Sequence, residues 1–242
     1  MMNINKIKIN FLTYIFICLF LFSGYKNNVL CILFIFIIHE LGHIFFCILF
    51  HVKIVKIEIF PFGGILKLNI PINYSLIKLF FISSGGLIFQ LFLFLINFLF
   101  IHNEMLNSYN YVILIFNALP IIPLDGFKIF QCILYNFIPY YYALVFSFIV
   151  GALFLVVILF YSDNLALFFF SFVFLIKNVS LLLVYFNKFL LERYLYKFKY
   201  KKSKYYRRLS FKKLRINYFG YFYDNGWKDE NYFLCKKFDK NP

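Results

Sequence analysis

Charged side chains are scarce in this 242-residue sequence and make up only 14% of it. Hydrophobic residues account for 63% and the mean hydropathy is +0.81, whereas a soluble domain has roughly 45–50% apolar residues. This shortage of charge excludes an ordinary soluble domain and indicates a membrane protein.

Several other common features are missing. The five cysteines contain no CxxC pair or zinc-ribbon spacing, which argues against a disulfide framework. No internal repeat or low-complexity linker is evident. No small-residue cleavage site follows the first apolar segment, 11–23, so we expect an uncleaved first helix rather than a signal peptide.

Long apolar runs dominate what is present. A membrane-spanning helix needs about 20 mostly apolar residues, and the sequence offers six such segments, although Pro120 and Pro123 should kink or end the fourth. The expected spans are 10–24, 29–50, 79–101, 109–127, 140–161 and 165–187.

Basic residues are distributed unevenly over the loops between these spans. Lysines precede the first span and fill the loop between the second and third, while the loops 102–108 and 162–164 contain neither lysine nor arginine. The positive-inside rule therefore predicts a multi-pass protein with both termini in the cytoplasm.

Two segments should lie outside the bilayer. Residues 53–70 alternate partly between polar and apolar side chains around a Pro-Phe-Gly-Gly turn, which predicts a β-hairpin at the membrane surface. Residues 192–242 contain 15 Lys and Arg against 5 Asp and Glu, a net charge of +10. We interpret them as a solvated cytoplasmic tail that is drawn toward anionic lipid headgroups and has no nucleic-acid role.

A His-Glu-x-x-His motif, formed by His39, Glu40 and His43, lies inside the second span. Positions i and i+4 of a helix face the same way, so both imidazoles can reach one metal ion while Glu40 stands beside it. Ionisable groups inside hydrocarbon cost about 2.5–3.5 kcal/mol each on insertion scales and persist mainly where they pair or ligate. The motif therefore predicts a zinc site within the membrane. His51 and His102 lie at span ends and are not expected to be ligands.

A catalytic zinc usually has three protein ligands and one open position. Asp125 is the candidate for the third, because it follows two prolines that should interrupt a helix near the metal. Irregular backbone at membrane depth is tolerated where protein or water surrounds it, which predicts a cavity. Asp163 falls in the loop 162–164, on the side of the membrane away from the cytoplasm, and is not expected to be a ligand.

Alternatives without proteolysis stay open. The two histidines and Glu40 could form a hydrogen-bonded cluster between helices without a metal, and the chain could be a metal transporter or an inactive scaffold. Transporters usually distribute acidic and His residues along a pathway through several helices. This sequence instead concentrates its acidic and His residues at one predicted three-ligand site with an adjacent glutamate, which favours hydrolysis.

Together, His39-Glu-Leu-Gly-His43 and the segment from Asn117 through Asp125 to Gly126 resemble the site-2 protease family of intramembrane metallopeptidases, over roughly residues 1–190. The turn at Pro61-Phe-Gly-Gly64 is similar to a membrane-embedded hairpin of that family. The pattern departs from the family in the third span, where Ser83-Ser-Gly-Gly86 lacks the usual proline and Gln90 is the only nearby amide. Gly85 and Gly86 are expected to allow close helix packing there.

The apolar runs, the alternating segment and the charge distribution predict an all-α polytopic membrane protein with about six transmembrane helices, a small membrane-associated β-hairpin and a short basic cytoplasmic tail. The resemblance agrees with this fold. It implies a protease domain over 1–191, one Zn²⁺ held by His39, His43 and Asp125, Glu40 as catalytic acid and base, and Asn117 as a catalytic residue that positions substrate or stabilises the oxyanion. The tail, 192–242, is too short for a complete pair of cystathionine-β-synthase-type repeats.

Within the family, the sequence is most similar to the sporulation-type enzymes, which implies cleavage of a membrane-associated transcription-factor precursor such as pro-sigma-K. The implied partners are membrane lipid, this protein substrate and membrane-protein inhibitors. A general site-2 protease that acts on another membrane substrate is the alternative with the same chemistry.

Overall fold

The structure, a computed structural model, describes residues 7–9, 11, 13–14, 24, 26–60, 63–68, 74–161, 181–195, 202–207, 210–216, 218–224 and 226–238. The chain divides into two compact units. The first comprises Met1–Ile70 and Phe80–Ala118, and the second comprises Pro71–Leu79 and Leu119–Pro242.

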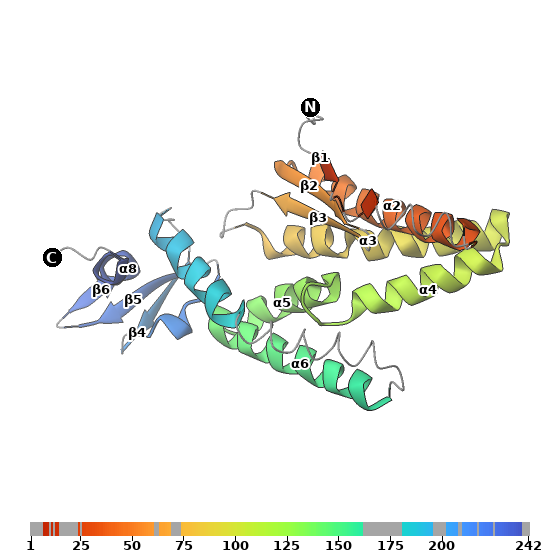
Figure 1. The fold of residues 1–242 in the computed structure, drawn as a ribbon. Coiled ribbons are helices and arrows are strands. Elements are labelled where there is room, and N and C mark those ends of the chain that lie inside the picture. The colour runs from red at the N-terminus through yellow and green to blue at the C-terminus, as the bar shows by residue number, and fades with distance from the viewer. Residues whose placement is uncertain are drawn as a thin grey trace. The chain divides into compact units, whose positions relative to one another are not determined.

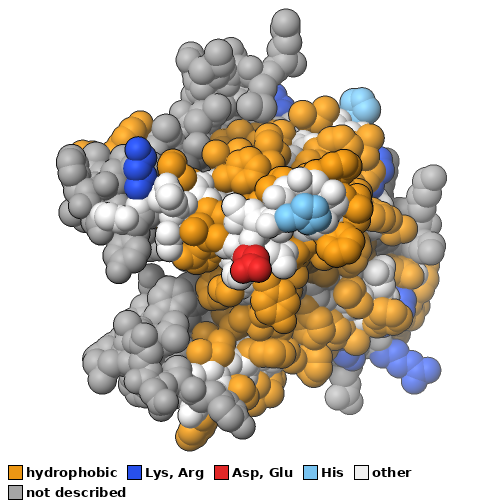
Figure 2. Space-filling view, turned by 90° about the vertical axis from the view of Figure 1, so that its right-hand side faces the viewer, with side chains coloured by type: hydrophobic (Ala, Val, Ile, Leu, Met, Phe, Trp, Pro, Cys, Tyr) orange, Lys and Arg blue, Asp and Glu red, His pale blue; other side chains and the backbone are white. Residues whose placement is uncertain are grey.

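Three described helices are long and apolar enough to cross a membrane: Lys26–Leu49, Leu76–Ile101 and Tyr140–Ile158. They match the second, third and fifth predicted spans. The first and sixth predicted spans fall largely outside the described residues, and the helix at 181–195 extends past the predicted end of the sixth. Figure 2 shows apolar side chains over most of the described surface on one face, which suits contact with lipid.

The first unit combines α2 (Lys26–Leu49), most of α3 (Leu76–Ile96), the π-helix η2 (Asn97–Ile101) and α4 (Glu104–Ala118) with a three-stranded sheet. The predicted hairpin is confirmed, because β2 (Ile54–Phe60) pairs antiparallel with β3 (Gly63–Leu68). The additional strand β1 (Ile7–Ile9) pairs parallel with β2 and was not expected. In Figure 1 the sheet lies beside α2.

Helices α2 and α3 approach closely at Gly42 and Gly85. A Cβ atom placed on Gly85 would lie 2.6 Å from the carbonyl oxygen of Gly42, and one on Gly42 would collide with the Gly85 carbonyl. Only glycine fits at these two positions, as expected for helix pairs that pack through small residues. The crossing positions α3 directly against the buried face of α2, where His39 and His43 lie.

The predicted proline interruption is found, and it ends one helix before the next begins. Helix α4 ends at Ala118, residues 119–124 are not helical, and α5 (Asp125–Phe137) begins anew. Neither Pro120 nor Pro123 has a backbone N–H to continue the helical ladder. A Cβ atom placed on Gly151 of α6 (Tyr140–Tyr161) would lie only 2.7 Å from the carbonyl oxygen of Pro120. Helix α6 therefore packs directly against this segment.

The described part of the predicted solvated tail forms a small folded body. Strand β4 (Lys202–Tyr206) pairs parallel with β5 (Tyr218–Tyr223), which pairs antiparallel with β6 (Trp227–Asp229). The 3₁₀ helix η3 (Phe211–Lys213) and α8 (Glu230–Phe238) complete what we call the C-terminal module. Its apolar core is continuous with that of α5, α6 and the helix at 181–195.

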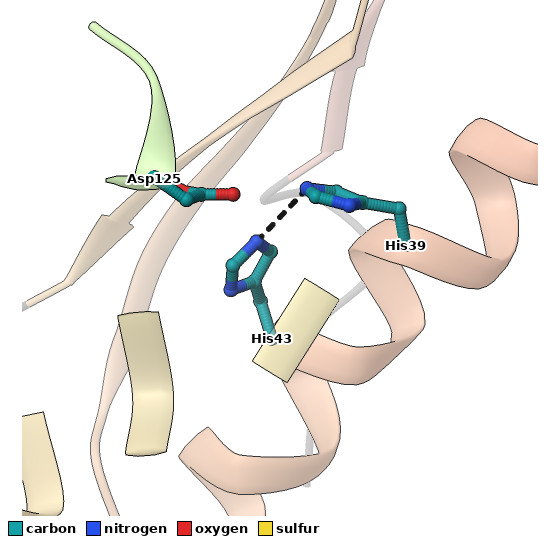
Figure 3. Close-up of side chains that lie close together, drawn as sticks. All are labelled: His39, His43 and Asp125. Atoms are coloured by element: carbon teal, nitrogen blue, oxygen red, sulfur yellow. Dashed lines mark hydrogen bonds between the residues drawn. The ribbon is translucent and has the colours of Figure 1, made fainter. Parts of the chain in front are cut away.

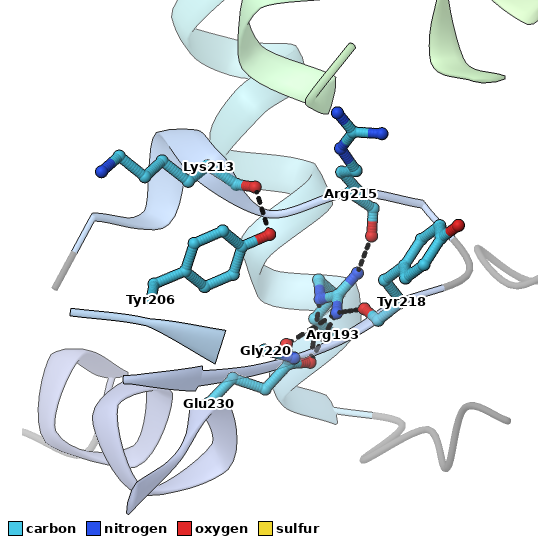
Figure 4. Close-up of polar contacts among 7 residues, drawn as sticks. All are labelled: Arg193, Tyr206, Lys213, Arg215, Tyr218, Gly220 and Glu230. Atoms are coloured by element: carbon cyan, nitrogen blue, oxygen red, sulfur yellow. Dashed lines mark hydrogen bonds and ion pairs between the residues drawn. The ribbon is translucent and has the colours of Figure 1, made fainter. Parts of the chain in front are cut away.

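A buried ion pair holds this module to the helix at 181–195 (Figure 4). Arg193 Nη2 lies 2.7 Å from both carboxylate oxygens of Glu230, and each residue is 1% exposed. Arg193 also donates to the carbonyls of Arg215 and Tyr218, and Gly220 N–H donates to Glu230 Oε2 at 2.7 Å. These bonds satisfy both charges away from water.

Candidate metal and catalytic site

The His-Glu-x-x-His motif lies in the middle of α2, with His39 and His43 both buried. Their Nε2 atoms face each other at 3.2 Å, and the ring centroids are 4.9 Å apart. The i, i+4 spacing therefore brings the two imidazoles together, as the sequence predicts.

Each imidazole has its other nitrogen next to an oxygen of α3. His43 Nδ1 lies 2.8 Å from the backbone carbonyl of Ile82, and His39 Nδ1 lies 3.0 Å from Oε1 of Gln90. A carbonyl oxygen only accepts hydrogen bonds, so both Nδ1 atoms donate in this arrangement and both Nε2 atoms present lone pairs. Two converging lone pairs are the donor arrangement that a metal ion requires.

Glu40 follows His39 on α2 and is half-buried. Its Oε1 accepts a hydrogen bond of 2.8 Å from the backbone N–H of Gly64 on β3. A Cβ on Gly64 would lie 2.7 Å from the carboxyl carbon of Glu40. The hairpin thus contacts the glutamate of the motif through backbone atoms, at a glycine where a larger residue would displace the carboxylate.

In the second unit, Asp125 is the first residue of α5 and is 5% exposed. Its Oδ1 accepts from Lys128 Nζ at 3.0 Å, and a carboxylate is favoured at a helix N-terminus by the helix dipole. Phe127, two residues further along α5, is buried against the ring of Phe148. The local backbone of Asp125 is therefore an ordinary helix start.

Asn117 lies in the last turn of α4 and is half-buried. Its Nδ2 donates to the carbonyl of Ile113 in the same helix at 3.1 Å. This hydrogen bond of the amide therefore stays within α4. The assignment of Asn117 as a catalytic residue stays a prediction.

Sequence reasoning missed the part that α3 plays. Gln90 was noted only as an amide in an apolar span, and Gly86 only as a packing residue. In the structure, a Cβ on Gly86 would lie 2.6 Å from His39 Nδ1, so this glycine makes room for the imidazole ring. The signal was the single amide in α3, four residues after a glycine.

Comparison with known proteins finds a sequence relative and a solved structure with a similar fold. The chain is 32% identical over 143 residues to stage IV sporulation protein FB of Bacillus subtilis, an alignment that covers 56% of this chain and 50% of that protein. The chain thus spans about half the length of that relative. No family model matches the sequence. The fold is similar to the site-2 protease from Methanocaldococcus jannaschii, with a TM-score of 0.51 and 20% identity, over 74% of this chain and 93% of that one.

Proposed function

The chain is a relative of the site-2 proteases, and from this premise we propose that it is an intramembrane zinc endopeptidase. The observation that carries the proposal is the buried pair His39 and His43, whose Nε2 atoms converge at 3.2 Å while acceptor oxygens orient both Nδ1 atoms. Buried imidazoles arranged this way suit a metal ion better than a hydrogen-bonded cluster without one.

Asp125 is the third ligand in this proposal. His39, His43 and Asp125 are all buried and have the side-chain types that hold a metal ion (Figure 3). Two imidazoles and one carboxylate are the donor set of a catalytic zinc with an open position. The residues therefore fit one Zn²⁺ per chain.

The chemistry follows from the groups around such an ion. Bound zinc would polarise the scissile carbonyl and lower the pKa of water to about 7. Glu40, which is beside the imidazoles and held by Gly64 N–H, takes the proton of the attacking water and passes it to the leaving amine. Asn117 positions substrate or stabilises the oxyanion with the second N–H of its amide, since the first donates to the Ile113 carbonyl.

The substrate in this proposal is a membrane-associated transcription-factor precursor of the pro-sigma-K type, and the protein acts in sporulation. The similarity to a sporulation protein supports this choice. The protein is a multi-pass membrane protein with both termini in the cytoplasm, in contact with lipid and regulated by membrane-protein inhibitors. The distribution of basic residues over its loops supports this orientation.

Co-expression tests the proposal directly. The unchanged chain, Glu40→Gln and the control Glu104→Gln, which alters an exposed carboxylate at the start of α4, are each expressed with pro-sigma-K or with an unrelated membrane substrate. We expect cleavage of pro-sigma-K by the unchanged chain and the control, and none by Glu40→Gln, which still retains zinc.

Two outcomes would contradict parts of the proposal. Full activity of Glu40→Gln would overturn the mechanism. Cleavage of the unrelated substrate alone would overturn the sporulation assignment and favour a general site-2 protease.

A further inference from the structure

We propose that Gln90 is a positioning residue that holds His39 in the tautomer needed for zinc binding; this inference rests on the proposed function. Gln90 lies in α3 with Ile82 and Gly86, at intervals of four residues, so the three positions form one stripe along the helix. Each of them contacts a histidine of the motif.

The two histidines have different kinds of hydrogen-bond acceptor on this stripe. At His43 the acceptor is the backbone carbonyl of Ile82, and any residue at position 82 would supply such a carbonyl. At His39 the acceptor is a side-chain oxygen, Gln90 Oε1 at 3.0 Å, which only the residue at position 90 supplies. The orientation of His39 therefore depends on the amino acid at position 90, while that of His43 depends on the backbone alone.

Gly86 makes the contact between His39 and Gln90 possible. A Cβ at this position would lie 2.5 Å from Nε2 and 2.6 Å from Nδ1 of His39, so the ring rests directly on the helix backbone. With the ring in this place, donation from Nδ1 to Gln90 leaves the lone pair of Nε2 directed at Nε2 of His43.

Burial of the Gln90 amide costs free energy, because one of its polar atoms is unpaired within the described part of the chain. The side chain is fully buried, and Nε2 has no hydrogen-bond partner among the described residues. Its backbone carbonyl accepts from Asn110 Nδ2 at 3.0 Å, a bond that survives replacement of the side chain. Leucine would fill this position without an unpaired amide nitrogen. Replacement by leucine should therefore weaken zinc binding without lowering the stability of the zinc-free protein.

The test compares Gln90→Leu, which removes the acceptor, with Gln90→Glu, which keeps an oxygen that accepts from Nδ1. Gln131→Leu in α5 is the matched control, because its Nε2 is also buried without a partner among the described residues. Zinc affinity is measured on the full chain in detergent by competition with a chelator. Thermal unfolding of the zinc-free chain and ¹⁵N NMR of its four histidines are measured in parallel.

We expect Gln90→Leu to bind zinc about 10–100-fold more weakly, which is the usual effect of losing an outer hydrogen-bond partner of a metal-binding histidine. Its melting temperature should stay unchanged or rise, and one histidine should lose its Nδ1–H signature. Gln90→Glu should bind zinc nearly as the unchanged chain does. Gln131→Leu should match the unchanged chain in zinc affinity and in the histidine NMR signals, and its melting temperature should also stay unchanged or rise.

Equal zinc affinity of the unchanged chain and a folded Gln90→Leu would overturn the inference and leave the proposed function intact. If Gln90→Leu does not fold, Gln90→Met tests the same loss of the acceptor. Absence of zinc binding by the unchanged chain would instead overturn the proposed function.

Discussion

The backbone N–H of Gly64 on β3 donates to Oε1 of Glu40 on α2 at 2.8 Å, so a strand contacts the glutamate of the His-Glu-x-x-His motif. A side chain at position 64 would require the Glu40 carboxylate to move. The hairpin therefore does more than cover the helix, because it determines where the Glu40 carboxylate lies.

Gly64→Ala should lower cleavage without removing zinc. The added methyl would lie 2.7 Å from the Glu40 carboxyl carbon and force it to move, and a misplacement of about 1 Å can cost about 10²-fold in rate. Cleavage of a co-expressed substrate and the zinc content of the purified protein provide the two measurements. Leu66→Ala in the same strand is the control for general disturbance of the hairpin, and full activity of Gly64→Ala would show that the contact is unimportant.

The adjacent glycines of α3 should fail in different ways. Gly85→Ala places a methyl against the backbone of Gly42, so it should destabilise the zinc-free protein by about 1–3 kcal/mol through overpacking. Gly86→Ala displaces the His39 ring, so its main effect should be lost zinc affinity. Thermal unfolding and chelator competition separate the two, and identical behaviour of both variants would contradict the separation.

Asp125→Asn should release zinc from the detergent-purified protein, because a neutral amide replaces the carboxylate ligand. Metal analysis after dialysis measures the retained zinc. Lys128→Met is the matched variant, since it removes the 3.0 Å ion pair to Asp125 and leaves the carboxylate in place. It should retain zinc. Unchanged metal content in Asp125→Asn would exclude Asp125 as a ligand.

Breaking the ion pair of the C-terminal module should destabilise it. Arg193→Met leaves the buried Glu230 carboxylate without its cation, and such a loss costs about 3–5 kcal/mol. Trp227, the only tryptophan of the chain, lies in β6 of the module, so its fluorescence reports the unfolding of this body. The double variant with Glu230→Met should be less destabilised than the sum of the two single variants, whereas additive losses would mean that the residues act independently.

Much of the candidate site was predictable from local patterns. The spacing of His39 and His43 implies a shared face on any helix, and Pro120 with Pro123 implies a break before Asp125, because neither prediction needs a distant contact. The hairpin was predictable for the same reason, since its turn and both strands lie within 53–70. Strand β1 was not, because its pairing with β2 joins residues about fifty positions apart.

The C-terminal module shows why charge counts mislead. Arg193 and Glu230 are 37 positions apart and look like two charges of a solvated basic segment. They are instead the buried pair that connects the helix at 181–195 to α8, and only the folded chain brings them together. Local composition does not reveal which charges have partners.

The chemistry that we propose was suggested by the sequence alone, since two imidazoles, a glutamate and an aspartate in an apolar chain are the side chains of a metal site. The orientation of those groups came from tertiary contacts. The close approach of α2 and α3 at Gly42 and Gly85 puts Ile82, Gly86 and Gln90 against the histidines, and pairing of β2 with β3 puts Gly64 against Glu40. Local residue patterns follow from backbone periodicity, whereas tautomers and carboxylate positions depend on neighbours that only packing supplies.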